Sequence, residues 1–281
     1  MSGGDEIFGI FGHPVSQSRS PAMHNAAFAA LGMNCFYAAF DIKPEDVAAA
    51  VEAIKTLSIR GVNVTVPHKT AVMREMDFLS PEAELAGAVN TVKNNGGRLE
   101  GYNTDIEGAL TALEVSMGFR PGGKTALVIG AGGAARAVVA GLCMKNAAGV
   151  LISNRSAGNA EKLGGEFAGR FPAMRIETSG LEDAETGGFT ADADIIINCS
   201  SAGMEGNSPL SMPLEKFKGK HGVYDLVYKP SVTPLVRRAR EMGIKAESGI
   251  DMLLYQGAKS FEIWTGKDAP TDVMRKALEG E

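Results

Sequence analysis

The chain has 281 residues, of which 44% are hydrophobic and 22% charged, and this is enough for two globular cores. A net charge of −5 argues against nucleic acid as the main partner, because nucleic-acid binding leaves a basic patch or stripe. No apolar run reaches the length of a membrane span, the first ten residues lack the basic start of a signal peptide, and three scattered cysteines do not form a disulfide framework. We therefore expect a cytoplasmic protein without a membrane partner.

The first hundred residues alternate short strand patterns with alanine-rich helical patterns. The expected strands and helices, in chain order, are residues 6–12, 21–33, 35–42, 44–58 and 61–66. This β-α-β-α-β order predicts a mostly parallel sheet covered by helices. A helical piece is expected near 68–78, and the Asn-Asn-Gly-Gly centre of 90–103 predicts an antiparallel hairpin at one edge of the sheet. Residues 104–119 are expected as a helix capped by Thr104.

The alternation restarts after the glycine-rich break at 120–124. Six further strands are expected, in the segments TALVIG, GVLISN, MRIETS, DIIINCS, GVYDLVY and IKAES, with 186–194 as a loop. Six strands with helical connections match the two mononucleotide-binding halves of a Rossmann fold. The apolar helix expected at 252–266 must pack on another element, and we expect it to return to the first domain.

The strand-to-helix turn of the second half has the pattern Gly130-x-Gly132-x-x-Ala135. Gly130 permits a tight turn, Gly132 lets a pyrophosphate approach the backbone, and Ala135 allows close packing of helix on strand. The helix N-terminus attracts the phosphate charge. This pattern in this context predicts dinucleotide binding.

The end of the following strand favours NADP over NAD. An NAD site usually places a carboxylate there for the ribose 2′-hydroxyl, whereas this strand ends in Asn154-Arg155-Ser156. A guanidinium holds a 2′-phosphate by charge-assisted hydrogen bonds. Asn159 stands where a second cation would strengthen this prediction, and Lys162 lies one turn later.

Lys69 follows a strand in the segment GVNVTVPHKT, residues 61–70. Pro67 cannot donate a ladder hydrogen bond, so strand pairing should end there and leave Lys69 at the tip of a rigid element. The segment alone leaves two interpretations open: Lys69 is solvated, or it is directed at a bound molecule. Asp105, considered alone, fits the first turn of a helix, where the dipole favours acids.

Several motifs together resemble the shikimate dehydrogenase family. They are SQSRSPAMHN (16–25), GVNVTVPHK (61–69), GAVNT (87–91), NTDIEG (103–108), GAGGAARA (130–137), NRS (154–156), YDLVYKP (224–230) and GIDMLLYQG (249–257). They span nearly the whole chain. The resemblance implies an α/β protein of two domains: a substrate domain with a mostly parallel sheet (1–104 plus 249–281) and a doubly wound, Rossmann-type NADP-binding domain (105–248).

The resemblance also implies an enzyme that reversibly reduces 3-dehydroshikimate to shikimate with NADPH. It assigns catalysis to Lys69 and Asp105, which fits the need for a proton or positive charge beside the alkoxide formed on a ketone. The implied substrate-binding residues are Ser18, Ser20, Asn63, Thr65, Asn90, Tyr228 and Gln256. The implied cofactor-binding residues are Gly130, Ala131, Gly132, Gly133, Ala134, Asn154, Arg155, Ser156, Leu226, Gly249 and Met252.

No histidine or cysteine spacing matches a metal site, so we expect no metal. Cys199 is interpreted as a small buried residue rather than a nucleophile. Two alternative functions stay open at this point: an NAD-dependent quinate or quinate/shikimate dehydrogenase, and a cofactor-bound sensor without catalysis. The expected partner is a small-molecule substrate, with the protein a monomer or homodimer.

Overall fold

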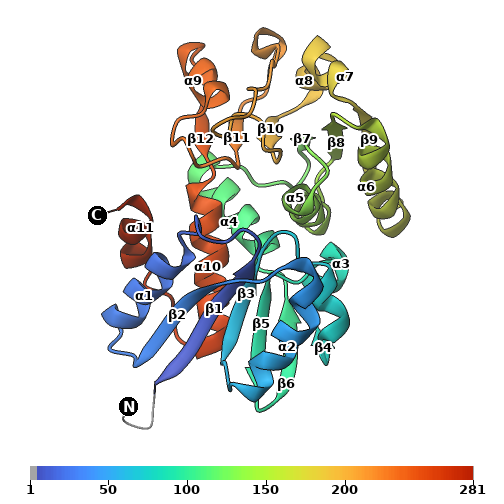
Figure 1. The fold of residues 1–281 in the computed structure, drawn as a ribbon. Helices are drawn as coiled ribbons and strands as arrows, with labels where there is room; N and C mark the ends of the chain where they lie inside the picture. Colours follow the sequence, from blue (N-terminus) through green and yellow to red (C-terminus); the bar gives the residue numbers. More distant parts are fainter. Residues whose placement is uncertain (1–4, 281) are drawn as a thin grey trace. The chain divides into compact units, whose positions relative to one another are not determined.

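The computed structural model describes residues 5–280, apart from the side chain of Thr186, and it divides into two compact units. Unit 1 comprises Met1–Gly108 and Leu254–Glu281, and unit 2 comprises Ala109–Leu253. Each unit contains one six-stranded sheet with helices packed on it (Figure 1). The protein is therefore an α/β protein with two mostly parallel sheets, as the sequence predicts.

The chain begins with ten helices and strands, of which the first five alternate as predicted. They are β1 (Glu6–Gly12), α1 (Ser20–Ala30), β2 (Cys35–Asp41), α2 (Val47–Thr56), β3 (Gly61–Val64), β4 (Phe78–Leu79), α3 (Pro81–Ala86), β5 (Thr91–Asn95), β6 (Arg98–Tyr102) and α4 (Asp105–Met117). Short 3-10 turns, η1 (Pro44–Asp46) and η2 (Ala71–Glu75), precede α2 and β4. The sheet order is β2-β1-β3-β5-β6-β4, with β1 parallel to β2 and β3.

Three details of unit 1 differ from the sequence-based expectation. The hairpin β5–β6 forms as predicted, but it is not the edge, because the two-residue strand β4 pairs with β6. The strand expected at 61–66 ends at Val64, and 68–78 contains a 3-10 turn rather than an α-helix. The helix at 104–119 begins at Asp105, where Asn103 Oδ1 accepts from the Ile106 N–H at 3.4 Å, while the hydroxyl expected to cap it bonds elsewhere.

The C-terminal helices α10 (Ile250–Thr265) and α11 (Thr271–Glu279) complete unit 1, which α10 enters at Leu254. The Trp264 indole donates a hydrogen bond to the Val92 carbonyl at 2.9 Å. A Cβ at Gly61 would lie 2.4 Å from the Trp264 Nε1 atom, so a glycine in β3 is what lets this ring lie against the sheet. Burial of such an aromatic ring supplies much of the packing energy that fixes the helix.

Unit 2 contains six parallel strands and their connecting helices. They are β7 (Thr125–Ile129), α5 (Gly133–Met144), β8 (Gly149–Asn154), α6 (Ala157–Arg170), β9 (Arg175–Gly180), α7 (Leu181–Thr186), α8 (Gly188–Asp192), β10 (Ile195–Asn198), η3 (Leu214–Lys216), β11 (Gly222–Asp225), α9 (Pro234–Glu241) and β12 (Ala246–Ser248). The order β12-β11-β10-β7-β8-β9 is that of a doubly wound Rossmann sheet. The predicted loop at 186–194 is wrong, because α8 occupies most of it.

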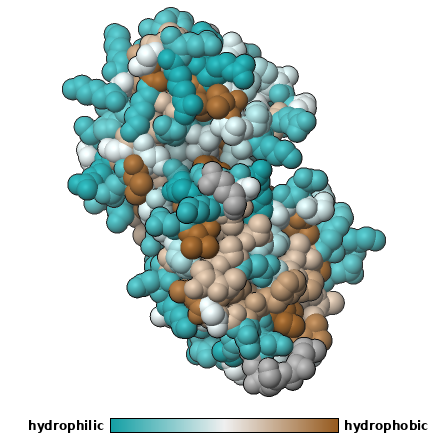
Figure 2. All heavy atoms as spheres, turned by 90° about the vertical axis from the view of Figure 1, so that its left-hand side faces the viewer, coloured by the Kyte–Doolittle hydropathy of each residue, from teal (hydrophilic) through white to brown (hydrophobic). Residues whose placement is uncertain are grey.

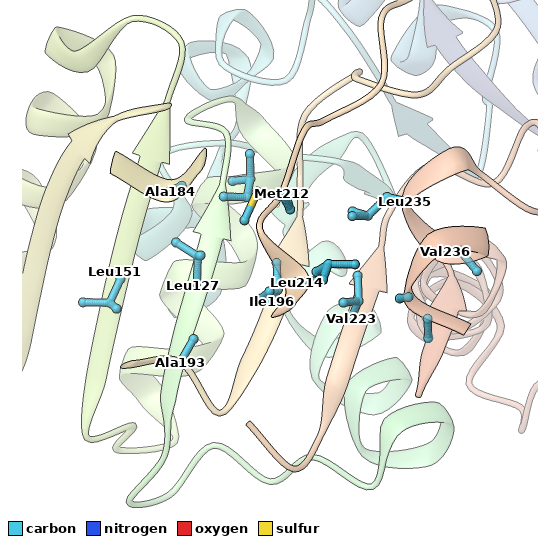
Figure 3. Close-up of a cluster of buried hydrophobic side chains, with 13 residues drawn as sticks. Leu127, Leu151, Ala184, Ala193, Ile196, Met212, Leu214, Val223, Leu235 and Val236 are labelled. Atoms are coloured by element: carbon cyan, nitrogen blue, oxygen red, sulfur yellow. The ribbon is translucent and has the colours of Figure 1, made fainter. Parts of the chain in front are cut away.

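One hydrophobic core of unit 2 lies on a face of this sheet (Figure 3). Leu127, Ile196 and Val223 project from three neighbouring strands and are fully buried. Leu235 and Val236 of α9 cover the β11 side of this cluster. Strands buried on both faces explain why these segments appear in the sequence as continuous apolar runs.

Candidate active site

Lys69 lies on a segment that is anchored through its own carbonyl and through the side chain of the preceding residue. The Val89 N–H donates to the Lys69 carbonyl at 2.8 Å. The buried imidazole of His68 forms a 2.7 Å hydrogen bond with the Ile42 carbonyl. With its neighbours anchored in this way, the Lys69 side chain remains 21% exposed and its direction is defined.

Asp105 is the first residue of α4, and its carboxylate pairs with Lys69. The distance from Lys69 Nζ to Asp105 Oδ2 is 2.5 Å, and the Asp105 side chain is only 9% exposed. The other carboxylate oxygen, Oδ1, accepts a hydrogen bond from Asn90 Nδ2 at 2.9 Å. The helix N-terminus further favours the negative charge. The two side chains that the resemblance assigned to catalysis are thus in direct contact, although they are 36 residues apart.

Asn63 continues this row of hydrogen bonds away from the ion pair. Its Oδ1 accepts from the Tyr37 hydroxyl at 2.7 Å, and its Nδ2 donates to the Asn90 carbonyl at 3.2 Å. Burial raises the pKa of Tyr37 well above its ordinary value, while a hydrogen bond with Ser20 lowers it. Tyr37 is therefore a neutral donor that links Ser20 to Asn63.

The other residues expected to bind substrate in unit 1 differ in how they are held. The Ser20 N–H donates to Ser18 Oγ at 3.2 Å. Thr65 is half-buried against Gly12, and its hydroxyl makes no hydrogen bond within residues 5–280. A Cβ at Gly108 would lie 2.7 Å from the Gln256 Cβ, so a glycine there permits the close approach of α4 and α10. Tyr228 belongs to unit 2, in the segment after β11, and is half-buried.

Several polar residues near this site were not found by sequence reasoning. They are Tyr37, Thr91, Thr104 as a network member rather than a cap, and Ser260. Ser260 lies one helical turn after Gln256, and its hydroxyl oxygen is 3.0 Å from the Gln256 carbonyl oxygen. A second polar side chain at i+4 on an apolar helix was a signal that could have revealed it.

His24 lies beneath the same row, in a cluster of aromatic rings. Its ring stacks on Tyr37 at a centroid distance of 4.5 Å, and Trp264 lies at 5.4 Å. Neither ring nitrogen makes a hydrogen bond with a residue that the structure describes. Burial lowers the pKa of His24 to about 3, although nearby Asn63 opposes this shift. The imidazole is therefore neutral in the folded protein at neutral pH.

The glycine loop of unit 2 fits a dinucleotide phosphate. Gly130 has a φ of +113°, and a Cβ there would lie 3.1 Å from the Cys199 carbonyl, so a side chain is disfavoured. Gly132 and Gly133 are exposed, and a Cβ on either would meet nothing within 4 Å. No side chain caps the start of α5, which leaves its backbone N–H groups for an anion. The half-buried Ala131 and Ala134 complete the loop.

The end of β8 carries the residues expected at the cofactor ribose. Asn154 Nδ2 donates to the Ser156 carbonyl at 2.9 Å, which tightens the turn before α6. Arg155 is exposed, and its guanidinium makes no hydrogen bond or ion pair within the described part of the chain. A cation in this state is available to hold a phosphate group.

The remaining residues expected at the cofactor lie after β11 and β12. A Cβ at Gly249 would lie 2.1 Å from the Leu226 carbonyl oxygen, so these two segments touch through backbone alone. The Met252 N–H donates to the Tyr224 hydroxyl at 3.3 Å, and the Met252 side chain is buried. These segments follow the carboxyl ends of parallel strands, where ligands bind in open α/β sheets.

Over residues 5–280, no group of three or more acidic, histidine or cysteine side chains could hold a metal ion. Nor does any helix in that range have the length and apolarity needed to cross a membrane. Burial raises the pKa of the Cys199 thiol, and the charge of Asp225 raises it further. Cys199 is thus a protonated thiol rather than an activated nucleophile.

A doubly wound sheet with a dinucleotide loop, together with a lysine–carboxylate pair beside buried amides, defines an oxidoreductase that uses a nicotinamide cofactor. Family models match three segments of the chain: a shikimate dehydrogenase substrate-binding domain at residues 10–92, a shikimate/quinate 5-dehydrogenase domain at 115–205 and a shikimate 5′-dehydrogenase C-terminal domain at 249–279. The chain belongs to the shikimate dehydrogenase family.

Similar proteins match over nearly their full length. Shikimate dehydrogenase (NADP(+)) of Symbiobacterium thermophilum is 46% identical, covering 99% of this chain and 97% of that protein. Shikimate 5-dehydrogenase of Thermus thermophilus, solved with NADP(H) and shikimate, is 38% identical with a TM-score of 0.85, covering 98% of this chain and 99% of that one. Shikimate 5-dehydrogenase of Listeria monocytogenes, solved with shikimate and NAD, is 36% identical with a TM-score of 0.91, covering 97% and 96%.

Proposed function

We propose that the chain is an NADP-dependent shikimate dehydrogenase that reversibly reduces 3-dehydroshikimate to shikimate, a step of aromatic amino acid biosynthesis. The observation that carries this proposal is the 2.5 Å contact between Lys69 and Asp105. In this account unit 1 is the substrate-binding and catalytic domain, and unit 2 is the NADP-binding domain. The domain boundaries expected from the sequence, 1–104 plus 249–281 and 105–248, belong to the same proposal.

Bound NADPH would supply a hydride to the ketone carbon, and the residues of the chain must then stabilise the charge that develops on oxygen. The Lys69 ammonium provides both a positive charge and a proton for that oxygen. Asp105 orients the ammonium through Oδ2 and is itself held by Asn90 through Oδ1. In the reverse direction the same pair accepts the proton of the shikimate hydroxyl.

The substrate is a polyhydroxy carboxylate, so its hydroxyl groups need fixed partners once water is removed. In our proposal Asn63, Thr65, Asn90 and Gln256 serve the ring hydroxyls, Ser18 and Ser20 serve the carboxylate, and Tyr228 lines the site. The unengaged hydroxyl of Thr65 supports this role, because it is free to bond a ligand within the part of unit 1 that the structure describes. Ser18 and Ser20 bring no cation, so recognition of the carboxylate relies on neutral donors.

The cofactor residues were assigned through the resemblance, and their geometry supports NADP. Gly130 to Ala134 would hold the pyrophosphate, and Leu226, Gly249 and Met252 would surround the nicotinamide. Asn154, Arg155 and Ser156 would surround the ribose, with the unpaired guanidinium of Arg155 on the 2′-phosphate. Asn159 leaves this site with one fewer cation, and Lys162 on α6 is the nearest substitute in the sequence.

We further propose a cytoplasmic enzyme that is a monomer or homodimer and has no nucleic-acid partner. All three cysteines are free, as a reducing compartment favours. Apolar side chains gather on the face of unit 1 where α1 and β2 lie (Figure 2). Phe36, on the edge strand β2, is 62% exposed, and an exposed apolar edge strand favours pairing of two copies. Light scattering at several concentrations separates monomer from homodimer.

The proposal is tested by initial rates with two substrates and two cofactors: shikimate or quinate, each with NADP or NAD. We expect the highest kcat/KM for shikimate with NADP. A clear preference for quinate with NAD would identify the alternative enzyme instead. Absence of turnover in all four combinations, with NADP binding intact, would indicate a sensor without catalysis.

A further inference from the structure

Three buried hydroxyl side chains lie behind the ion pair: Thr91, Thr104 and Ser260, which we call the hydroxyl cluster. Each is at most 2% exposed. Thr91 Oγ1 lies 2.8 Å from Ser260 Oγ and 3.3 Å from Thr104 Oγ1, and Ser260 Oγ lies 3.1 Å from Thr104 Oγ1. Buried hydroxyls are costly unless they are bonded, so the direction of each hydrogen bond in this cluster matters.

The cluster determines which way the Asn90 amide points. Asn90 Oδ1 accepts from the Thr104 backbone N–H at 2.7 Å and from the Thr91 hydroxyl at 3.0 Å. With its oxygen held by these two donors and the Thr104 hydroxyl 3.2 Å away, Asn90 presents Nδ2 to Asp105 Oδ1 and to Thr104 Oγ1, each at 2.9 Å. The flipped amide would place an oxygen against the carboxylate and lose both donors.

Ser260 and Asn63 leave the single hydroxyl proton of Thr91 for Asn90. Thr91 Oγ1 and Ser260 Oγ lie 2.8 Å apart, which requires a proton between them, and in our assignment Ser260 Oγ donates it. Asn63 Nδ2 supplies that oxygen with a donor at 3.0 Å. Because Ser260 donates to Thr91, the Thr91 proton goes to Asn90 Oδ1 at 3.0 Å.

We propose that Thr91 is a positioning residue of the reaction. Its hydroxyl holds the Asn90 amide, the amide holds Asp105 Oδ1, and Asp105 Oδ2 is thereby directed at Lys69. The inference rests on the proposed function, because it assigns Thr91 a part in that same reaction. Thr91 acts only through Asn90, so loss of its hydroxyl should lower kcat more than it changes the affinity for substrate.

The test is Thr91→Val, which removes the hydroxyl but keeps the size and the β-branching that suit strand β5. We expect kcat to fall about tenfold, the effect of one buried hydrogen bond, and KM for shikimate to change less than about threefold. Thr91→Ser keeps the hydroxyl and should restore kcat. Thr91→Cys, with a weak donor of similar size, should give an intermediate kcat.

A double-mutant cycle separates positioning from a general loss of stability. In an Asp105→Asn background, Thr91→Val should lower kcat no further, because the carboxylate it positions is gone. The matched control is Thr190→Val in unit 2, which removes a buried hydroxyl that donates to the Ala184 carbonyl at 2.9 Å and should leave kcat unchanged.

Two outcomes would overturn the inference: wild-type kcat in Thr91→Val, or losses that add in the double variant. If Thr91→Val is too unstable to assay, Thr91→Cys and Thr91→Ser decide the question through their relative kcat. Failure of the proposed function gives a different result, since the wild-type protein would then not turn over shikimate with NADP at all.

Discussion

The candidate catalytic site of unit 1 and the cofactor loop of unit 2 are built in opposite ways. In unit 1 the polar side chains are hydrogen-bonded to one another in a row, from Tyr37 through Asn63 and Asn90 to Asp105. In unit 2 the loop presents backbone N–H groups and empty space at Gly132, beside an unpaired Arg155. A group that handles a proton needs a fixed direction, whereas a phosphate needs room and donors.

The largest loss of turnover is expected when the hydrogen-bonded site of unit 1 is disrupted at Asp105. Asp105→Asn removes the carboxylate that orients Lys69 and leaves the Asn90 donor facing an amide. We expect kcat to fall about 10²- to 10⁴-fold, the usual contribution of acid–base catalysis, with shikimate binding measurable by calorimetry.

Glu107→Gln is the matched control for Asp105→Asn. Glu107 lies in the same first turn of α4 and forms a 3.2 Å ion pair with Lys259, with 56% of its side chain exposed. Loss of such a surface pair costs little, so kcat should remain within about twofold of wild type. An equal loss in both variants would show that any charge change in this turn disables the enzyme.

The cofactor loop of unit 2 can be disrupted by adding a side chain at Gly132. A Cβ at Gly132 would meet nothing within 4 Å, so the free energy of unfolding of Gly132→Val should stay close to wild type. The side chain would instead occupy the space that a pyrophosphate needs, and we expect NADP binding to weaken on the order of a hundredfold. Fluorescence titration with NADPH measures this. Unchanged affinity would show that the phosphate does not approach the loop here.

A smaller effect is expected from Arg155→Gln, which keeps a polar side chain but removes the charge. The loss of a charge-assisted hydrogen bond to the 2′-phosphate should lower kcat/KM for NADP about tenfold. NAD lacks that phosphate, so its kcat/KM is the internal control and should not change. Equal losses with both cofactors would assign Arg155 to the common part of the dinucleotide.

The smallest expected effect on turnover is at His24, which packs against Tyr37, and this prediction concerns the pH dependence of stability. Its pKa is about 3 in the fold against an ordinary value of 6.5, so the unfolded chain binds a proton that the folded chain does not. The free energy of unfolding is therefore unaffected by His24 above pH 6.5, and it decreases as the pH falls from 6.5 toward 3. His24 changes the free energy of unfolding by at most about 1.4 kcal/mol per pH unit in this range.

His24→Phe should remove this slope while keeping an aromatic ring against Tyr37. Urea unfolding at a series of pH values between 4 and about 7 measures the free energy of unfolding for both proteins. His13→Gln, at an exposed histidine of the same unit, should retain the wild-type slope. A slope that survives in His24→Phe would mean that other groups bind the protons.

Much of the fold was predictable because its signals are local. The apolar runs, the glycine turns and the Gly130 loop each identify an element within a few residues. The two-residue strand β4 and the short helices α3 and α8 were missed, since their formation depends on tertiary partners such as β6. For the same reason the strand at 61–66 was predicted two residues too long.

The site was predictable only where a motif marks it. Lys69 and Asp105 were found through the resemblance, but their contact depends on how β3 and α4 pack, which no local pattern contains. The three hydroxyl residues are of types that are common in strands, helix caps and helices, so nothing in the sequence marks Thr91, Thr104 or Ser260. Their role depends on three distant segments meeting in a buried place, and this is a property of the folded chain alone.

The most direct test of the central claim, that Lys69 provides the charge and proton for the reacting oxygen, is turnover and shikimate affinity measured together for Lys69→Ala. Lys93→Ala, at a half-buried lysine on β5, is the control and should retain activity. We predict that Lys69→Ala loses about 10²- to 10⁴-fold in kcat while its dissociation constant for shikimate remains measurable. Near-normal turnover in Lys69→Ala would contradict the account.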